Sequence, residues 1–147
     1  MSANEKDKSR HRDLLTRPLQ MSWSNHPDAP TDGQRLCEVE DVPEGECLEL
    51  RFGPEADVLS LFVHRSGDAV RAYLNRCPHF SLPLNARPGV FLVLEGGRIL
   101  CPHHSAVFRL EDGRGDDSRC AALSLHPVPI DVRDGAVFIA SGRPAAA

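Results

Sequence analysis

The chain has 147 residues, a formal net charge of −4, 41% apolar residues and 26% charged residues. This length allows one domain with a substantial core and is too short for two full domains. The charge balance gives no strongly basic character that would favour nucleic acid, and the longest apolar runs, such as GVFLVLEGG, are too short to cross a bilayer.

Residues 1–33 differ from the rest of the chain, since they carry mixed charges, several prolines and few core-forming residues. They predict an extended or disordered arm, with Trp23 as a possible anchor, although ordinary packing of this side chain is the simpler interpretation. The first residues, MSANEKDKSRHRDLL, show neither an apolar secretory segment nor a twin-arginine signal. We therefore expect a cytoplasmic protein. The chain has five cysteines, an odd number, which in a reducing compartment indicates ligands or buried thiols rather than a disulfide framework.

From Arg35 onward the sequence is typical of short strands. The segments GECLELRF, VLSLFVHR and AVRAYLNR hold apolar or alternating runs bounded by Gly, Pro or Asp. Ser66-Gly67-Asp68 and Gly96-Gly97 each separate two such runs, and Asp134-Gly135 predicts a tight hairpin between IDVR and AVFIA. Long helical periodicity is absent. We expect an all-β domain of small antiparallel sheets over residues 34–141 and a disordered tail over residues 142–147.

Two short phrases, RCPHFSLPLN and CPHHSAVF, each combine cysteine, proline and histidine. Together they offer two thiolates and two imidazoles, from Cys77, His79, Cys101 and His104. This donor set selects zinc or iron–sulfur chemistry over magnesium or calcium. One tetrahedral zinc would make the site structural, whereas a two-iron centre could place the cysteines on one iron and the histidines on the other. A proline follows each cysteine and stiffens the loop that must aim the ligands.

The pattern C-x-H followed by C-x-x-H resembles the signature of Rieske iron–sulfur proteins. The flanking text, LNRCPHFSLPLN and LCPHHSAVFRLEDG, is also similar to small bacterial Rieske-type ferredoxins and to the Rieske domains of ring-hydroxylating oxygenases. The resemblance implies a Rieske-like fold with two cluster-binding loops at one tip. It implies one [2Fe–2S] cluster held by Cys77, His79, Cys101 and His104. The interval between the ligand pairs is longer than in most relatives, and a hairpin around Gly96-Gly97 would absorb the difference.

Such a cluster implies a one-electron carrier that delivers electrons from a reductase to a terminal oxygenase or similar enzyme, without catalysis of its own. A catalytic oxygenase would need a further two-His-one-carboxylate iron site, and residues 105–147 contain a single histidine, His126. Two alternatives remain. One is a structural or accessory Rieske-like subunit of a larger oxidoreductase, as in assimilatory nitrite reductase, and the other is a structural zinc module.

His103 competes with its neighbour His104 as a ligand, and the family spacing selects His104. The resemblance also bears on redox potential. High-potential respiratory Rieske proteins carry a disulfide between the cluster loops, and the matching positions here are Leu82 and His103. Those proteins also direct serine and tyrosine hydroxyls at the cluster sulfurs, where this chain has Ala106 and Phe108. Neither side chain can donate a hydrogen bond, so we expect a low potential.

The other three cysteines, Cys37, Cys47 and Cys120, are interpreted as buried small hydrophobes. Cys120 also corresponds to a cysteine that relatives often carry in the loop covering the cluster, which allows a packing role near the site. The acidic run Glu38–Glu49 is ordinarily a solvated face. The alternative, more specific interpretation is a docking surface for a basic reductase.

Overall fold

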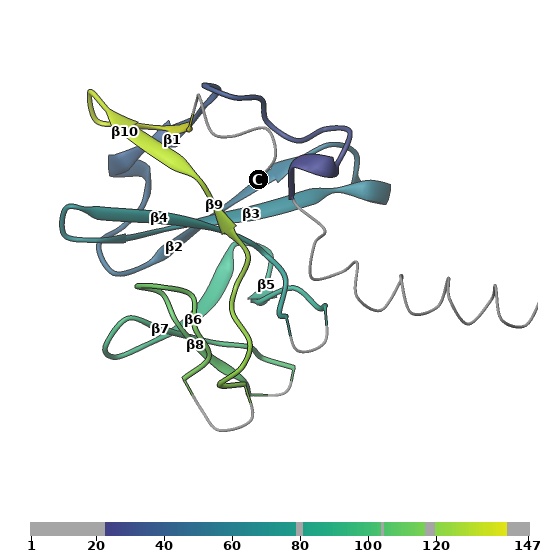
Figure 1. Ribbon diagram of the computed structural model, residues 1–147, viewed down its shortest axis with the longest axis vertical. Helices are drawn as coiled ribbons and strands as arrows, with labels where there is room; N and C mark the ends of the chain where they lie inside the picture. The colour runs from purple at the N-terminus through teal and green to yellow at the C-terminus, as the bar shows by residue number, and fades with distance from the viewer. Residues whose placement is uncertain (1–22, 79–80, 104, 117–119, 141–147) are drawn as a thin grey trace, which may run out of the picture.

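The computed structural model describes residues 23–78, 81–103, 105–116 and 120–140, which form three small antiparallel sheets (Figure 1). Their strand orders are β1-β11-β10, β2-β3-β4-β9 and β5-β6-β7-β8. The strands are β1 (Arg35–Glu38), β2 (Cys47–Phe52), β3 (Leu59–Ser66), β4 (Ala69–Leu74), β5 (Asn85–Arg87), β6 (Val90–Leu94), β7 (Arg98–Leu100), β8 (Val107–Arg109), β9 (Pro127–Val128), β10 (Ile130–Arg133) and β11 (Ala136–Ile139). The all-β prediction is therefore confirmed.

Helical structure in the described residues is limited to short 3-10 turns. These are η2 (Trp23–Asn25), η3 (Val39–Asp41) and η4 (Glu55–Asp57). Across the residues that the structure describes, no helix has the length and apolar character needed to span a membrane.

Strand β3 is buried on both faces because its sheet lies between the other two. Leu59, Leu61 and Val63 point to a core shared with β11 and β1, whereas Phe62 points to a second core shared with β7 and β8. Side chains alternate along a strand, so an unbroken apolar run fits a strand covered on both sides. Figure 1 shows the same three layers, with β10 and β1 at the top, β2, β3 and β4 in the middle and β6, β7 and β8 below.

The two hairpins expected at Gly96-Gly97 and Asp134-Gly135 are present, and the break expected at Ser66-Gly67-Asp68 forms a third. Ser66 pairs with Ala69 across the β3–β4 turn, and β6 pairs with β7 on either side of Gly96-Gly97. Asp134 and Gly135 have φ angles of 52° and 76° between the paired β10 and β11. Positive φ at both central residues is the conformation of a type I′ turn, whose twist matches that of the flanking strands.

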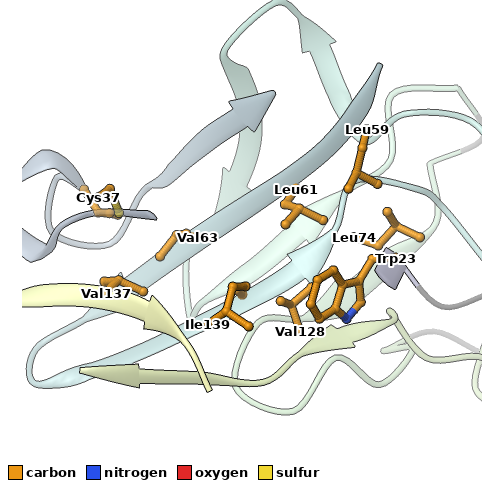
Figure 2. Close-up of a cluster of buried hydrophobic side chains, with 11 residues drawn as sticks. Trp23, Cys37, Leu59, Leu61, Val63, Leu74, Val128, Val137 and Ile139 are labelled. Carbon is orange, nitrogen blue, oxygen red and sulfur yellow. The ribbon is translucent and has the colours of Figure 1, made fainter. Parts of the chain in front are cut away.

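Residues 23–33 pack on the domain rather than extending from it. Trp23 is 4% exposed and lies among Leu59, Leu74, Val128 and Ile139 (Figure 2). The ordinary packing favoured by the sequence is what the structure shows for this side chain. Farther along, the Gly33 N–H donates to the Ile139 carbonyl at 3.0 Å. The rest of the expected arm, residues 1–22, and the expected tail, residues 142–147, lie outside the described residues.

Candidate metal centre

The two phrases that carry cysteine and histidine form loops with the same backbone closure. In the first loop, between β4 and β5, the Cys77 N–H donates to the Leu82 carbonyl at 2.7 Å. The Ser81 N–H donates back to the Cys77 carbonyl, also at 2.7 Å. The closure of this loop therefore begins at Cys77 and ends five residues later, at Leu82.

The second loop, between β7 and β8, repeats this arrangement. The Cys101 N–H donates to the Ala106 carbonyl at 2.7 Å, and the Ser105 N–H donates to the Cys101 carbonyl at 2.9 Å. Ser81 and Ser105 occupy the same left-handed conformation, with φ of 58° and 60°. Two loops closed by the same pair of backbone hydrogen bonds thus begin with a cysteine, although their histidines stand at different positions in the sequence.

Cys77 and Cys101 belong to one buried cluster. Both are fully buried, and they share their surroundings with Ile99 and Phe108 from the two strands that flank the second loop. As ligands the pair would be two thiolates in a common apolar environment, and a bound cation would offset their charge, since an isolated buried thiolate is unfavourable. This meeting of two cysteines from separate loops is what a shared metal centre requires.

The histidines that complete the predicted ligand set, His79 and His104, lie outside the described residues. His103 is described and exposed, which is consistent with the choice of His104 as the ligand without testing it. Within the described ranges, no three His, Cys, Asp or Glu side chains gather as a metal site. The ligand set Cys77, His79, Cys101 and His104 therefore stays a prediction.

A third segment packs in the apolar core that holds Cys77 and Cys101. Cys120 is fully buried there, and its Sγ lies 3.2 Å from the Val107 carbonyl oxygen. A Cβ on Gly115 would meet the Cys120 carbonyl oxygen at 1.8 Å, so a glycine is needed for this approach. The structure thus places Cys120 in a packing position beside the two candidate ligands.

Of the remaining cysteines, Cys37 lies in the other core, whereas Cys47 is partly buried and packs against the core that holds Cys77 and Cys101. Cys37 is 6% exposed in the core between the first and second sheets, and burial raises the pKa of its thiol to about 11. Cys47 packs beside His64, and burial raises its pKa to about 12. Such thiols stay protonated at neutral pH and are poor ligands and nucleophiles.

The positions matched to the hydroxyl donors of high-potential relatives are both apolar and enclosed. Ala106 is 2% exposed and Phe108 is fully buried, in the same cluster as Cys77 and Cys101. Neither side chain carries a donor, so the side-chain hydrogen bonds that such hydroxyls would make are missing at these two positions.

The first loop is also tied at its ends by a buried side chain that the sequence analysis missed. Asn75 is 7% exposed, its Oδ1 accepts from the Leu84 N–H at 2.8 Å, and its Nδ2 donates to Asn85 Oδ1 at 2.7 Å. Asn75 stands where the chain enters the loop, and it is thus hydrogen-bonded to Leu84 and Asn85, where the chain leaves it. The signal was present in the sequence, since an asparagine stands on each side of the loop.

The family model for the Rieske [2Fe-2S] domain matches residues 32–127. The chain belongs to this family. This Rieske domain is 33% identical over 105 residues to the 3-phenylpropionate/cinnamic acid dioxygenase ferredoxin subunit of Shigella flexneri serotype 5b (strain 8401), covering 70% of this chain and 88% of that subunit. It is 29% identical over 110 residues to human apoptosis-inducing factor 3, covering 75% of this chain but only 16% of that protein.

Among solved structures, the Rieske domain is similar to a chain in the complex of reduced oxygenase and oxidized ferredoxin in carbazole 1,9a-dioxygenase. The TM-score is 0.56 at 25% identity, and the match covers 72% of this chain and 90% of the other. Rieske domains carry one [2Fe–2S] cluster. The buried cysteine pair fits that group, because two thiolates are the sulfur donors that a Rieske cluster requires.

Proposed function

We propose that this protein is a Rieske-type ferredoxin, a one-electron carrier that passes electrons from a reductase to a terminal oxygenase or similar enzyme. The observation that carries the proposal is the burial of Cys77 and Cys101 in one apolar core. Each cysteine begins a loop, and the two loops are closed by the same backbone hydrogen bonds. The sequence match over 88% of a dioxygenase ferredoxin subunit supports the role of a separate small carrier.

In this proposal, Cys77 and Cys101 hold one iron, and His79 and His104 hold the other. When bound, the cluster supplies a site that accepts and releases one electron. The chain contributes the apolar enclosure around the sulfur ligands, which limits water and keeps the potential low. His103 stays outside the ligand set, where its exposed imidazole is available to solvent or to a partner.

The partners in this proposal are proteins rather than nucleic acid or membrane. The similar ferredoxin subunit belongs to a dioxygenase, and the similar solved chain belongs to a complex of ferredoxin with oxygenase. We infer a cytoplasmic location, in which a reducing environment would keep the thiols of Cys37 and Cys47 reduced. We further propose residues 34–141 as the cluster domain, with residues 1–33 as an N-terminal segment held to it at Trp23 and residues 142–147 as a tail.

A second candidate function is that of an accessory domain in a larger oxidoreductase. The match to a small part of human apoptosis-inducing factor 3 favours this alternative, because it shows that a related domain occurs inside a longer chain. A carrier should accept electrons from a ferredoxin reductase and reduce an oxygenase in solution at saturable rates. An accessory domain should do neither unless it is joined to its catalytic partner.

Composition and ligand variants test the cofactor. Protein purified without oxygen should be brown and contain about two irons and two acid-labile sulfides per chain. Alanine at Cys77, His79, Cys101 or His104 should abolish the centre. His103→Ala is the matched control and should leave it assembled. A colourless protein with one zinc per chain would show a structural zinc module instead, and cluster loss in His103→Ala would show that the ligand choice is wrong.

A further inference from the structure

Glu49 on β2 differs from the other carboxylates of the acidic run Glu38–Glu49. The run is otherwise a solvated face: Glu40, Asp41 and Glu44 are exposed. The Glu49 side chain is only 6% exposed. A buried carboxylate is unfavourable unless it is paired and hydrogen-bonded, so its partners should reveal what holds it in place.

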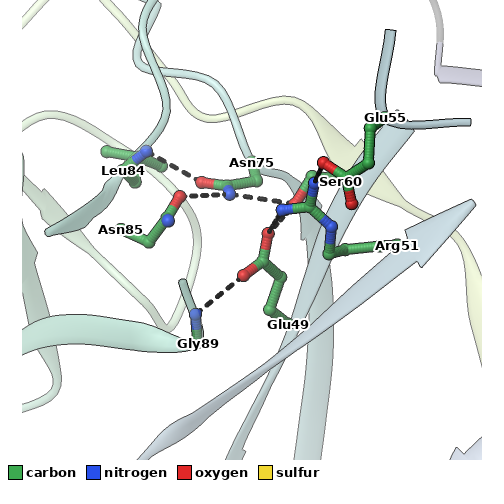
Figure 3. A network of polar contacts seen from close by, with 8 residues as sticks. All are labelled: Glu49, Arg51, Glu55, Ser60, Asn75, Leu84, Asn85 and Gly89. Atoms are coloured by element: carbon green, nitrogen blue, oxygen red, sulfur yellow. Dashed lines mark hydrogen bonds and ion pairs between the residues drawn. The ribbon is translucent and has the colours of Figure 1, made fainter. Parts of the chain in front are cut away.

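Those partners connect Glu49 to the first ligand loop (Figure 3). The Ser60 hydroxyl donates to Glu49 Oε2 at 2.7 Å, and Asn75 Nδ2 donates to the Ser60 hydroxyl at 3.0 Å. The other oxygen, Glu49 Oε1, accepts from the Gly89 N–H at 2.9 Å. Glu49 therefore lies at one end of a chain of hydrogen bonds that reaches Asn75 and, through it, the ends of the loop at Leu84 and Asn85.

The chemistry of the two ends fixes the direction of every bond in this chain. A carboxylate only accepts, so Ser60 must donate to Glu49 and accept from Asn75. At the other end, the Leu84 backbone N–H only donates, so it must meet the oxygen of the Asn75 amide. The Asn75 amide then has one orientation, with its two N–H bonds directed at Ser60 and Asn85.

We propose that Glu49 is a positioning residue for the first ligand loop, acting as the acceptor that orients Ser60 and Asn75 and so holds both ends of the loop. The effect on the cluster rests on the proposed function, because it requires that this loop carries Cys77 and His79 as ligands. The effect on the loop itself does not, since the hydrogen bonds are formed by the chain alone.

Arg51 offers a matched control for charge. Its Nη1 lies 3.4 Å from Glu49 Oε2, and its Nη2 lies 2.9 Å from Glu55 Oε2. The Glu55 side chain is 89% exposed, and its partner is Arg51 rather than Ser60 or Gly89. Glu55→Gln therefore removes the same charge beside the same arginine while leaving the chain of hydrogen bonds intact.

Glu49→Gln should disrupt that chain with little change in shape. The Gly89 N–H meets one carboxylate oxygen, and the Ser60 hydroxyl and Arg51 Nη1 meet the other. The glutamine amide has a single oxygen, so its NH2 group must face the donors on one of these two sides. Hydrogen–deuterium exchange by mass spectrometry on the full-length protein would report the result. We expect peptides covering residues 82–89 to exchange about tenfold faster than in the unmodified protein, the scale for losing a hydrogen bond to a charged group.

Further variants separate a positioning effect from a general loss of stability. Glu55→Gln should leave exchange in residues 82–89 within about twofold, and peptides from β10 and β11 should be unchanged in both variants. Ser60→Ala should reproduce Glu49→Gln, and the double variant should be no worse than either single one, as expected for groups that act as a unit. Equal effects of Glu49→Gln and Glu55→Gln, or no effect of Glu49→Gln, would overturn the proposal. If Glu49→Gln fails to fold, Ser60→Ala decides by the same criterion.

The cluster gives a second readout. In the loaded protein, Glu49→Gln should broaden the electron paramagnetic resonance lines of the reduced centre and shift its potential, whereas Glu55→Gln should change neither. Faster exchange in a protein without any iron would support the positioning of the loop and refute the proposed function. Normal exchange in a Glu49→Gln protein with an intact cluster would refute the positioning role of Glu49 and support the proposed function.

Discussion

The Tyr73 hydroxyl donates a hydrogen bond to the Leu110 carbonyl at 2.8 Å, and both residues are buried. Tyr73 lies on β4, just before the first ligand loop, and Leu110 follows β8, which comes just after the second. This bond therefore connects the strand that leads into the first ligand loop with the segment that follows the second. It joins the middle sheet to the third sheet from within their shared core.

Tyr73→Phe should lower the free energy of unfolding by about 1–2 kcal/mol, because the Leu110 carbonyl loses a buried donor while the ring packing is kept. Urea unfolding followed by circular dichroism would measure the change. The phenylalanine ring should still pack against Phe62, whose centroid lies 5.6 Å from that of Tyr73. A loss below about 0.3 kcal/mol would show that the bond contributes nothing net.

Stability should fall in alkaline solution. Burial raises the pKa of Tyr73 and Cys47 to about 12 and that of Cys37 to about 11, from ordinary values of 10.0 and 9.0. The folded state thus favours the protonated forms. Their contribution is fully present below about pH 9, where the unfolded thiols begin to ionise, and is lost as pH rises to about 12.

Thermal unfolding between pH 8 and 12 would test this expectation, with Cys47→Ala as the comparison. The variant should unfold with a smaller dependence on pH above about 9, since one of the three groups is gone. Parallel curves for the two proteins, offset only by a constant, would contradict the assigned role of Cys47.

The N-terminal segment should contain a part that does not contribute to stability, residues 1–20, and a part that does, around Trp23. Deleting residues 1–20 should leave the thermal midpoint and the cluster spectrum nearly unchanged, because that deletion spares the packed Trp23. Trp23→Ala should lower the free energy of unfolding by about 3 kcal/mol, as expected for truncating a buried aromatic side chain. A large loss on deleting residues 1–20 would show that part of this segment also packs on the domain.

Patterns of local chemistry predicted much of this fold. Asp134-Gly135 marked its hairpin because few residues accept positive φ, and the apolar run VLSLFVHR marked the strand β3. The burial of both faces of β3 came only from the structure. The two ligand phrases gave the positions of the loops. The contacts of Glu49 could not be predicted, since they depend on how β2, β3 and the β5–β6 turn meet in space. The left-handed conformation of Ser81 and Ser105 was also missed, because serine gives no local signal for it.

The redox potential should lie at the low end of the Rieske range, on the order of −150 mV, and vary little between about pH 6 and 8. A donor to a cluster sulfur stabilises the charge added on reduction, and Ala106 and Phe108 provide none. Ala106→Ser and Phe108→Tyr should each raise the potential by roughly tens of millivolts in film voltammetry. Val107→Thr is the control, because alternate side chains on β8 point to opposite faces. A midpoint above roughly +100 mV would contradict this assignment.

The most direct test of the central claim is the electron paramagnetic resonance spectrum of the dithionite-reduced protein. One iron ligated by histidine nitrogens and the other by Cys77 and Cys101 predicts the low average g value that distinguishes a Rieske centre from an all-cysteine [2Fe–2S] cluster. The signal should integrate to about one spin per chain. An average g value of the all-cysteine type, or a protein that gives no signal and contains zinc, would contradict the account.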